Sequence, residues 1–291
     1  MKAKKKEVLY AAIYILPSFL LISFFSLIPL VMNVYYSFTK YNVLQPAEWV
    51  GLTNYTRILK DVYVWDSLKN TAIFTIVTVP IQTSISLILA VVIKENMPKR
   101  IGNFIKSSLF VPVIASSVLI GSLWSVILQY NGVLNGFLSL FKVAPINWLG
   151  GQVTSLLSIC MVSIWKNIGY FLVIYFAGVL SVPQSYYEAA NVDGATYMQK
   201  FRFITLPCLK NITYLVVTLG TIWSFQVFDL VQIMTNGGPG RSTVTLVLTI
   251  YNAAFKEFNM GYASALAMVM LAFVLIISIV QKLVFKDDVE E

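Results

Sequence analysis

Six apolar stretches, each long enough to cross a bilayer, constrain the fold of this chain more than any other feature. They lie at about 8–38, 68–93, 107–129, 153–180, 212–235 and 261–284. Backbone amides in hydrocarbon must find partners within the protein, so such stretches form helices. Charged residues make up 12% of the chain, well below the roughly 25% of soluble domains. We therefore predict an all-α polytopic membrane protein with six transmembrane helices.

The first apolar stretch follows a lysine-rich start, as the core of a secretory signal peptide would. A signal peptide, however, has an apolar core of about 7–15 residues that ends at a small-residue cleavage site. The stretch at 8–38 is longer and lacks such a site. We expect it to remain as a spanning helix, with Pro17 and Pro29 as candidate kinks.

Lysines and arginines are distributed unequally between the two sets of loops. The N-terminus, the turn at 94–106, the segment at 181–211 and the tail together hold thirteen of the 21. The three opposite loops hold seven, and Lys166 lies within a span. Because cytoplasmic loops carry the excess of basic residues, both termini and the 181–211 segment are predicted to be cytoplasmic. The dispersed basic residues also argue against nucleic-acid binding.

The composition excludes most catalytic chemistry. The chain has no histidine and two cysteines, Cys160 and Cys208, which are not expected to form a disulfide framework. The GGPGRST sequence at 237–243 lacks the spacing of a phosphate-binding loop. No paired carboxylates or nucleophile constellation occurs, so we expect neither an enzyme nor a metal or cofactor site in this chain.

The polar segment at 181–211 interrupts the apolar runs and is predicted to form a helix–turn–helix. Ser181 and Gln184 have the spacing of a capping box. Gly194 can adopt the left-handed conformation that ends the first helix. A second helix is then expected to run until Pro207 ends it.

This segment resembles the EAA loop of ABC importer permeases. The matching positions are Glu188-Ala189-Ala190, Asp193-Gly194-Ala195, Phe201, Ile204 and Leu206-Pro207, whereas Asn211 replaces a proline usual in the family. The sequence FDLVQIMTNGGPGRST at 228–243 resembles the fifth helix and following loop of the carbohydrate-type permeases. The segment at 51–71 resembles the region before their membrane core, and the resemblance as a whole covers about 51–283.

The resemblance implies a type I importer permease of the binding-protein-dependent sugar family. Its domains would be an N-terminal helix with an external segment (1–67), a membrane core (68–284) and a cytoplasmic tail (285–291). The 181–211 loop would be the coupling element of that core. The implied ATPase-coupling residues are Glu188, Ala189, Ala190, Asp193, Gly194 and Ala195.

The implied partners complete a transporter in the cytoplasmic (inner) membrane of a prokaryote. They are a second homologous permease, two copies of a cytoplasmic ATPase that bind ATP and magnesium, and an external substrate-binding protein. The substrate would be a carbohydrate.

Two helical stripes are candidates for substrate contact. The residues of the fourth span are Ser163, Lys166, Asn167 and Tyr170, and those of the fifth are Gly220, Trp223, Ser224 and Val227. Each set has i, i+3, i+4, i+7 spacing and shares one helix face. The stripes match the faces that line the sugar site in maltose-type permeases. They are equally well interpreted as packing faces between helices. Asp229 is a candidate partner for Lys166 or a local backbone cap.

Other functions remain open at this stage. The same architecture could import glycerol-phosphate or another polyol, since a phosphate would need a cation such as Lys166. A secondary transporter would show an internal repeat and acidic residues within its spans, where only Asp229 qualifies. The sequence leaves open the identity of the sugar and which of the two permeases holds most of its contacts.

Overall fold

The computed structural model describes residues 14–285. The lysine-rich start and the residues after 285, both predicted to be cytoplasmic, lie outside this range. Four described helices are long and apolar enough to cross a membrane. They are Tyr14–Ser37, α4 (Val62–Asn96), α8 (Gln152–Ser181) and α15 (Met260–Phe285).

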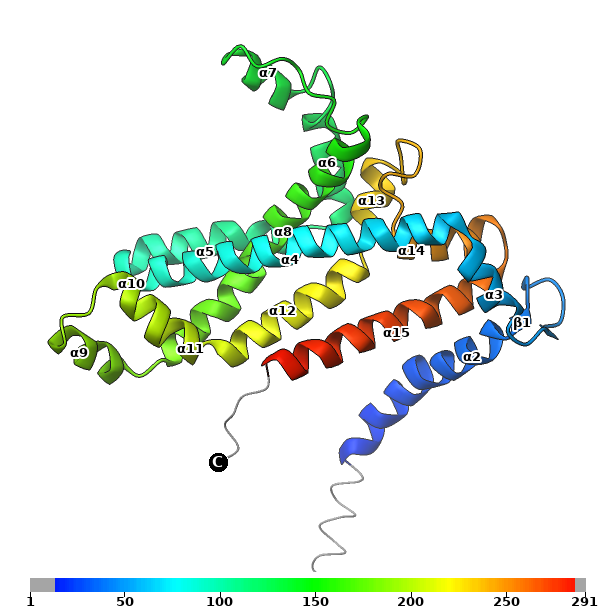
Figure 1. The fold of residues 1–291 in the computed structure, drawn as a ribbon, viewed down its shortest axis with the longest axis horizontal. Helices are drawn as coiled ribbons and strands as arrows, with labels where there is room; N and C mark the ends of the chain where they lie inside the picture. The colour runs from blue at the N-terminus through cyan, green and yellow to red at the C-terminus, as the bar shows by residue number, and fades with distance from the viewer. Residues whose placement is uncertain (1–13, 286–291) are drawn as a thin grey trace, which may run out of the picture. The chain divides into compact units, whose positions relative to one another are not determined.

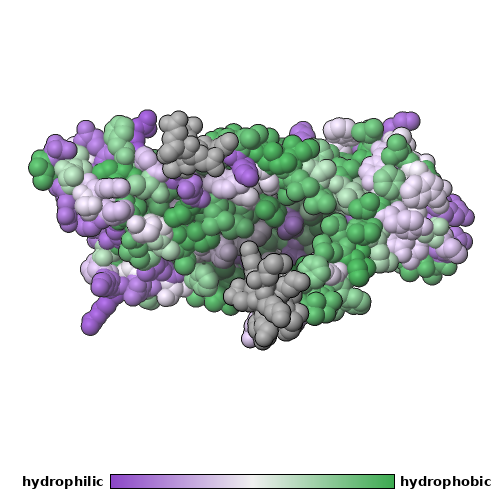
Figure 2. Space-filling model, turned by 90° about the horizontal axis from the view of Figure 1, so that it is seen from below, coloured by the Kyte–Doolittle hydropathy of each residue, from purple (hydrophilic) through white to green (hydrophobic). Residues whose placement is uncertain are grey.

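The two remaining predicted spans are bent. Helices α5 (Lys99–Ile114) and α6 (Ser117–Ile127) meet at 99°, and Tyr197–Cys208 meets α12 (Lys210–Phe225) at 70°. Counting each bent pair as one span gives up to six spans. Hydrophobic side chains cover much of the surface drawn in Figure 2. Such an apolar surface suits a protein surrounded by lipid.

The chain divides into two compact units. Unit 1 comprises Met1–Asp61 and Ile250–Leu271, and unit 2 comprises Val62–Thr249 and Ala272–Glu291. In unit 2, α4 packs along α8, and α5 and α12 pack against this pair (Figure 1). Two buried clusters stabilise unit 2, one around Phe171 and Leu172 and the other around Phe74 and Ile159.

Several polar side chains of α4 find hydrogen-bond partners inside the protein, as an apolar surrounding favours. The hydroxyls of Thr71 and Thr83 donate to the carbonyls of Ser67 and Val79, each four residues earlier in α4. The Ser86 hydroxyl donates to the carbonyl of Ile168 in α8 at 3.0 Å. Such hydrogen bonds hold neighbouring spans together.

Gly169 brings α5 and α8 into backbone contact. A Cβ atom at this position would lie 2.0 Å from the carbonyl oxygen of Leu109. Small residues permit such close helix crossings in membranes. Asn167 and Lys166 therefore lie beside a tightly packed crossing.

The third predicted span was wrong in its start and in its continuity. Helix α4 ends at Asn96 and α5 begins at Lys99. The turn predicted at 94–106 therefore consists of Met97 and Pro98 alone. The chain then breaks at Ala115 and Ser116, whose ψ angles of 143° and 136° are extended. The Ser116 hydroxyl accepts a hydrogen bond from the amide of Val118 and caps the new helix α6.

Two π turns accommodate prolines. The π turn η1 (Ser23–Leu27) precedes Ile28-Pro29, and η2 (Phe201–Thr205) precedes Leu206-Pro207. A proline ring clashes with the carbonyl four residues earlier and supplies no N–H, and the wider turn relieves both problems. Helix α11 (Leu206–Cys208) contains Pro207 and the chain then bends at Leu209, so the helix ends within one residue of the end predicted at Pro207.

Unit 1 contains short elements around a small hairpin. Strand β1 (Thr39–Lys40) pairs antiparallel with β2 (Glu48–Trp49), and α3 (Thr53–Lys60) follows. The Asn54 amide donates to the carbonyls of Ser37 and Thr39, both at 2.9 Å. The other loops also contain helices: α7 (Val133–Ser139), α14 (Leu246–Tyr251) and the π turn η3 (Asn252–Lys256).

Candidate functional site

A cavity of about 190 Å³ in unit 2 brings together most of the predicted substrate-binding residues. Its lining comes from α4, α6, α8, the end of α12 and the segment that follows α12. Six of the eight predicted residues line it: Ser163, Lys166, Asn167, Trp223, Ser224 and Val227. Tyr170 and Gly220 do not. The sequence analysis missed Phe74, Ser117, Gln226, Phe228 and Leu230, which complete the lining together with Asp229.

The stripe of α8 supplies the hydrogen-bonding side of the cavity. The Asn167 amide donates to the Ser163 hydroxyl at 3.3 Å, which fixes the orientation of the amide. Lys166 is half-buried on the same face. Tyr170 lies beside the site rather than in it, with its ring centroid 4.8 Å from that of Trp223. Tyr170 therefore packs against the Trp223 indole without lining the cavity.

The stripe of α12 divides between the cavity and a packing face. A Cβ atom at Gly220 would lie 3.0 Å from the Gln82 amide nitrogen, so Gly220 faces α4. The Ser224 hydroxyl donates to the Gly220 carbonyl and lies 3.1 Å from the Thr78 hydroxyl. Trp223 remains 37% exposed and offers its indole to the cavity.

The fifth predicted helix is interrupted. Helix α12 ends at Phe225, and the short helix α13 (Asp229–Met234) begins after a break. Val227 lies in this break, so it is not on the helical stripe that its spacing predicted. Its carbonyl accepts a hydrogen bond from the Thr245 hydroxyl at 3.1 Å. This contact satisfies a backbone group that an unbroken helix would have satisfied itself.

Lys166 and Asp229 both line the cavity but form no ion pair in the described structure. Of the two candidate roles of Asp229, the ion pair with Lys166 is therefore not formed between these described residues. Asp229 still acts electrostatically on Lys166, and each of these charged groups can interact with a hydroxyl-rich molecule. The cavity thus combines an aromatic plate, an amide and two charged groups.

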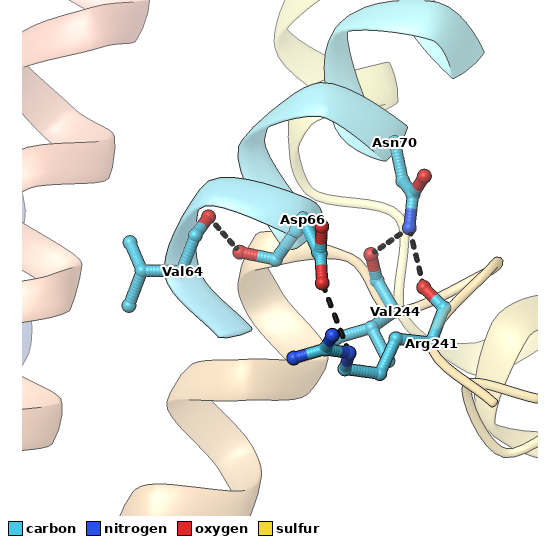
Figure 3. Close-up of polar contacts among 6 residues, drawn as sticks. Val64, Asp66, Asn70, Arg241 and Val244 are labelled. Atoms are coloured by element: carbon cyan, nitrogen blue, oxygen red, sulfur yellow. Dashed lines mark hydrogen bonds and ion pairs between the residues drawn. The ribbon is translucent and has the colours of Figure 1, made fainter. Parts of the chain in front are cut away.

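A second cavity of about 450 Å³ lies beside the loop that follows α13. The Asn70 amide donates to the carbonyls of Arg241 and Val244, at 2.8 and 3.0 Å, and Arg241 pairs with Asp66 at 3.0 Å (Figure 3). These contacts attach the GGPGRST loop to the first turns of α4. Sequence analysis predicted a turn here but not its anchor in α4.

The 181–211 loop forms two short helical pieces. Helix α9 (Gln184–Val192) has no side-chain cap, because Ser181 belongs to α8 and its hydroxyl donates to the Gly178 carbonyl. The predicted Ser181 capping box was therefore wrong. The capping box of this loop instead links Thr196 and Gln199 at the start of α10 (Tyr197–Lys200).

Gly194 ends α9 in the predicted left-handed conformation, with φ of 72°. The Ala195 amide donates to the Ala190 carbonyl at 2.9 Å, and the Gly194 amide to that of Asn191 at 3.1 Å. These two hydrogen bonds define a Schellman motif. The spacing of Ala190, Gly194 and Ala195 thus fixes how the helix ends.

The predicted coupling residues lie on an accessible surface. Glu188, Ala189, Asp193 and Gly194 are exposed, and Ala190 and Ala195 are half-buried. A groove of about 350 Å³ is lined by Ala190, Asp193, Gly194, Ala195, Gln199, Lys200, Phe203 and Ile204. Glu188 and Ala189 lie outside it. Phe203, at the edge of this groove, is 70% exposed.

Helical spans, a polar cavity between them and an accessible loop define a membrane permease. Residues 63–287 match the family described as binding-protein-dependent transport system inner membrane component, and the chain belongs to this family. It is 33% identical over 273 residues to the probable ABC transporter permease YurN of Bacillus subtilis, covering 92% of this chain and 93% of that protein.

Other relatives carry more specific names. The trehalose/maltose permease MalF of Thermococcus litoralis is 31% identical over 280 residues, covering 95% of this chain and 93% of that protein. The lactose permease LacF of Rhizobium radiobacter is 32% identical over 276 residues, covering 92% and 91%.

The fold also matches a crystal structure of a bacterial ABC transporter for the acidic polysaccharide alginate. The TM-score is 0.86 at 21% identity, and the match covers 99% of this chain and 98% of that chain. The fold is that of a type I ABC importer permease.

Proposed function

We propose that this chain is a transmembrane permease subunit of an ATP-driven importer and forms half of the pathway for a sugar or oligosaccharide. The observation that carries this proposal is the convergence of Lys166, Asn167 and Trp223 on one cavity. An indole offers a flat apolar surface for a sugar ring, and the amide and ammonium offer hydrogen bonds to its hydroxyls. Relatives named for trehalose/maltose and lactose transport support a carbohydrate substrate.

The proposed complex contains a second homologous permease, two cytoplasmic ATPases that hold ATP and magnesium, and an external binding protein. The alginate transporter crystallised with an alginate pentasaccharide-bound periplasmic protein supports the last of these. The accessible groove of the 181–211 loop suits docking of the ATPase. Both termini and this loop would then face the cytoplasm.

An anionic substrate is the second candidate, in the form of a glycerol-phosphate, a polyol phosphate or an acidic sugar. Lys166 carries no ion pair in the described structure and could meet such a group. A relative at 34% identity over 267 residues is named for sulfoquinovosyl glycerol transport. Asp229 in the same cavity opposes this alternative, because it would repel an anion.

The complex with its binding protein, reconstituted in liposomes, tests the proposal. Maltose, trehalose, lactose, alginate oligosaccharide and glycerol-phosphate would each be screened for stimulation of ATP hydrolysis. Stimulation by a neutral sugar supports the first candidate, and stimulation by glycerol-phosphate alone supports the second. If no ATPase assembles with the chain, the proposed function is wrong.

Trp223→Ala and Asn167→Ala are expected to reduce uptake about tenfold each, equivalent to about 1.4 kcal/mol of lost substrate contact. Assembly and basal ATP hydrolysis should stay near normal, because Asn167 bonds within its own helix and Trp223, although its ring contacts Tyr170 and Phe171, is 37% exposed rather than buried in the core. Trp165→Ala is the matched control, since Trp165 is also 37% exposed but lies outside the cavity. Normal uptake by both cavity variants would show that the stripes serve packing alone.

Reporter fusions test the proposed orientation. Fusions after Tyr41, Val143 and Lys256 should score as external, and those after Lys99 and Gln199 as internal, in line with the excess of basic residues on the second set. Activity of a periplasmic alkaline phosphatase and of a cytoplasmic reporter would be compared at each site. An external score at Gln199 would contradict docking of the 181–211 loop to a cytoplasmic ATPase.

A further inference from the structure

Helix α9 has a single buried anchor. Of its nine residues, Tyr187 is the buried one, with 7% of its side chain exposed. Its neighbours Tyr186 and Glu188 point to solvent. Side-chain contact between α9 and the core of unit 2 is therefore concentrated at one phenol ring.

The Tyr187 hydroxyl reaches the π turn η2. It lies 2.9 Å from the Thr205 hydroxyl, and Thr205 is fully buried. The Thr205 hydroxyl in turn donates to the Lys200 carbonyl at 3.4 Å. Since Thr205 has one hydroxyl proton, Tyr187 is the donor when both bonds form together. Burial raises the pKa of the Tyr187 phenol above its ordinary value, so the phenol keeps this proton.

Lys94, near the end of α4, meets the same ring. Its ammonium lies 4.7 Å from the centroid of the Tyr187 ring and donates to the carbonyl of Val179, near the end of α8, at 3.0 Å. The cation–π contact with the ring is favourable, and so is the position of the positive charge at the C-terminal end of a helix dipole. The ends of α4 and α8 and the π turn thus converge on Tyr187.

Resting on the proposed coupling role of the 181–211 loop, we propose that Tyr187 is the positioning residue that makes α9 move as one body with the ends of α4 and α8. The groove that suits the ATPase does not include Tyr187. Docking and transmission therefore use different side chains of the same loop. Without the Tyr187–Thr205 hydrogen bond, α9 could shift while the spans stay in place.

Distance measurements on the complete complex in lipid nanodiscs test this role. In a Cys208→Ser background, spin labels would be placed at Val192→Cys on α9 and Leu180→Cys on α8, both exposed positions. The probe is magnesium ATP with vanadate. With Tyr187 intact, the distance between the labels should stay narrow and unchanged on trapping. Tyr187→Phe should broaden or shift it.

Thr205→Val should reproduce the effect of Tyr187→Phe, and the double variant should be no worse, because both remove the same hydrogen bond. Tyr186→Phe, at an exposed neighbouring phenol, is the matched control. An unchanged distance in both single variants would overturn the inference. Loss of co-purified ATPase from Tyr187→Phe alone would overturn it too, since the residue would then shape the docking surface. Failure of the unsubstituted chain to retain an ATPase would instead refute the proposed function.

Discussion

Gly194→Val is expected to abolish uptake while the permease still inserts in the membrane. The φ angle of 72° at Gly194 lies in the left-handed region, where a β-branched residue costs about 1–2 kcal/mol. The Schellman hydrogen bonds of Ala195 and Gly194 depend on this conformation. Losing them would reshape the groove that both residues line. The purified variant would be compared with the unsubstituted complex for co-eluting ATPase and for uptake.

Gly194→Asn is the matched control, because asparagine tolerates the left-handed conformation better than other non-glycine residues. It should retain most uptake. Two further variants probe the surface rather than the turn: Ala190→Leu would fill the groove, and Glu188→Lys would reverse an exposed charge. Both should also abolish uptake. Normal ATPase retention and uptake in Gly194→Val, Ala190→Leu and Glu188→Lys would refute the coupling role of this loop.

Gly169→Ala is expected to prevent accumulation of a folded permease. The added methyl group would lie 2.0 Å from the Leu109 carbonyl oxygen, and backbone cannot rotate away as a side chain can. Separating α5 from α8 would cost at least the roughly 1–3 kcal/mol typical of overpacking, a large fraction of the roughly 5–15 kcal/mol by which folded domains are stable. Detergent-solubilised membranes would be analysed by fluorescence-detected size-exclusion chromatography and thermal stability.

Gly136→Ala should behave in the opposite way. No heavy atom lies within 4 Å of a Cβ atom at Gly136, and the residue sits in helix α7. Alanine favours a helix over glycine by about 0.5–1 kcal/mol, so this variant should be neutral or slightly more stable. Equal yields of the two variants would show that the crossing at Gly169 tolerates a wider separation.

The sequence was most informative where a local rule determines the structure. Hydropathy located the spans because the membrane requires long apolar helices, and Gly194 was predictable because few other residues adopt its conformation. Helical spacing also placed Lys166 and Asn167 on one face, and both line the cavity. Each of these features depends on residues close together in the chain.

Features set by distant contacts could not be predicted in this way. Spacing grouped Gly220 with Trp223, but only the packing of α12 against α4 shows that Gly220 meets Gln82. Hydropathy does not indicate the break at Ala115 and Ser116, since both residues are compatible with an apolar helix. Pro207 located the helix end to within one residue, but the π turn η2 before it leaves no signal in composition.

The break between α12 and α13 has a consequence for how variants of the cavity behave. Its backbone groups find partners within the protein, as main chain in an apolar surrounding requires: the amides of Gln226 and Val227 donate to carbonyls of α12, and the Val227 carbonyl accepts from the Thr245 hydroxyl. A substitution replaces a side chain and leaves those amides and carbonyls in place. The path of the chain at this point is therefore held by main-chain hydrogen bonds, and a change of one cavity side chain should alter the lining while leaving that path in place.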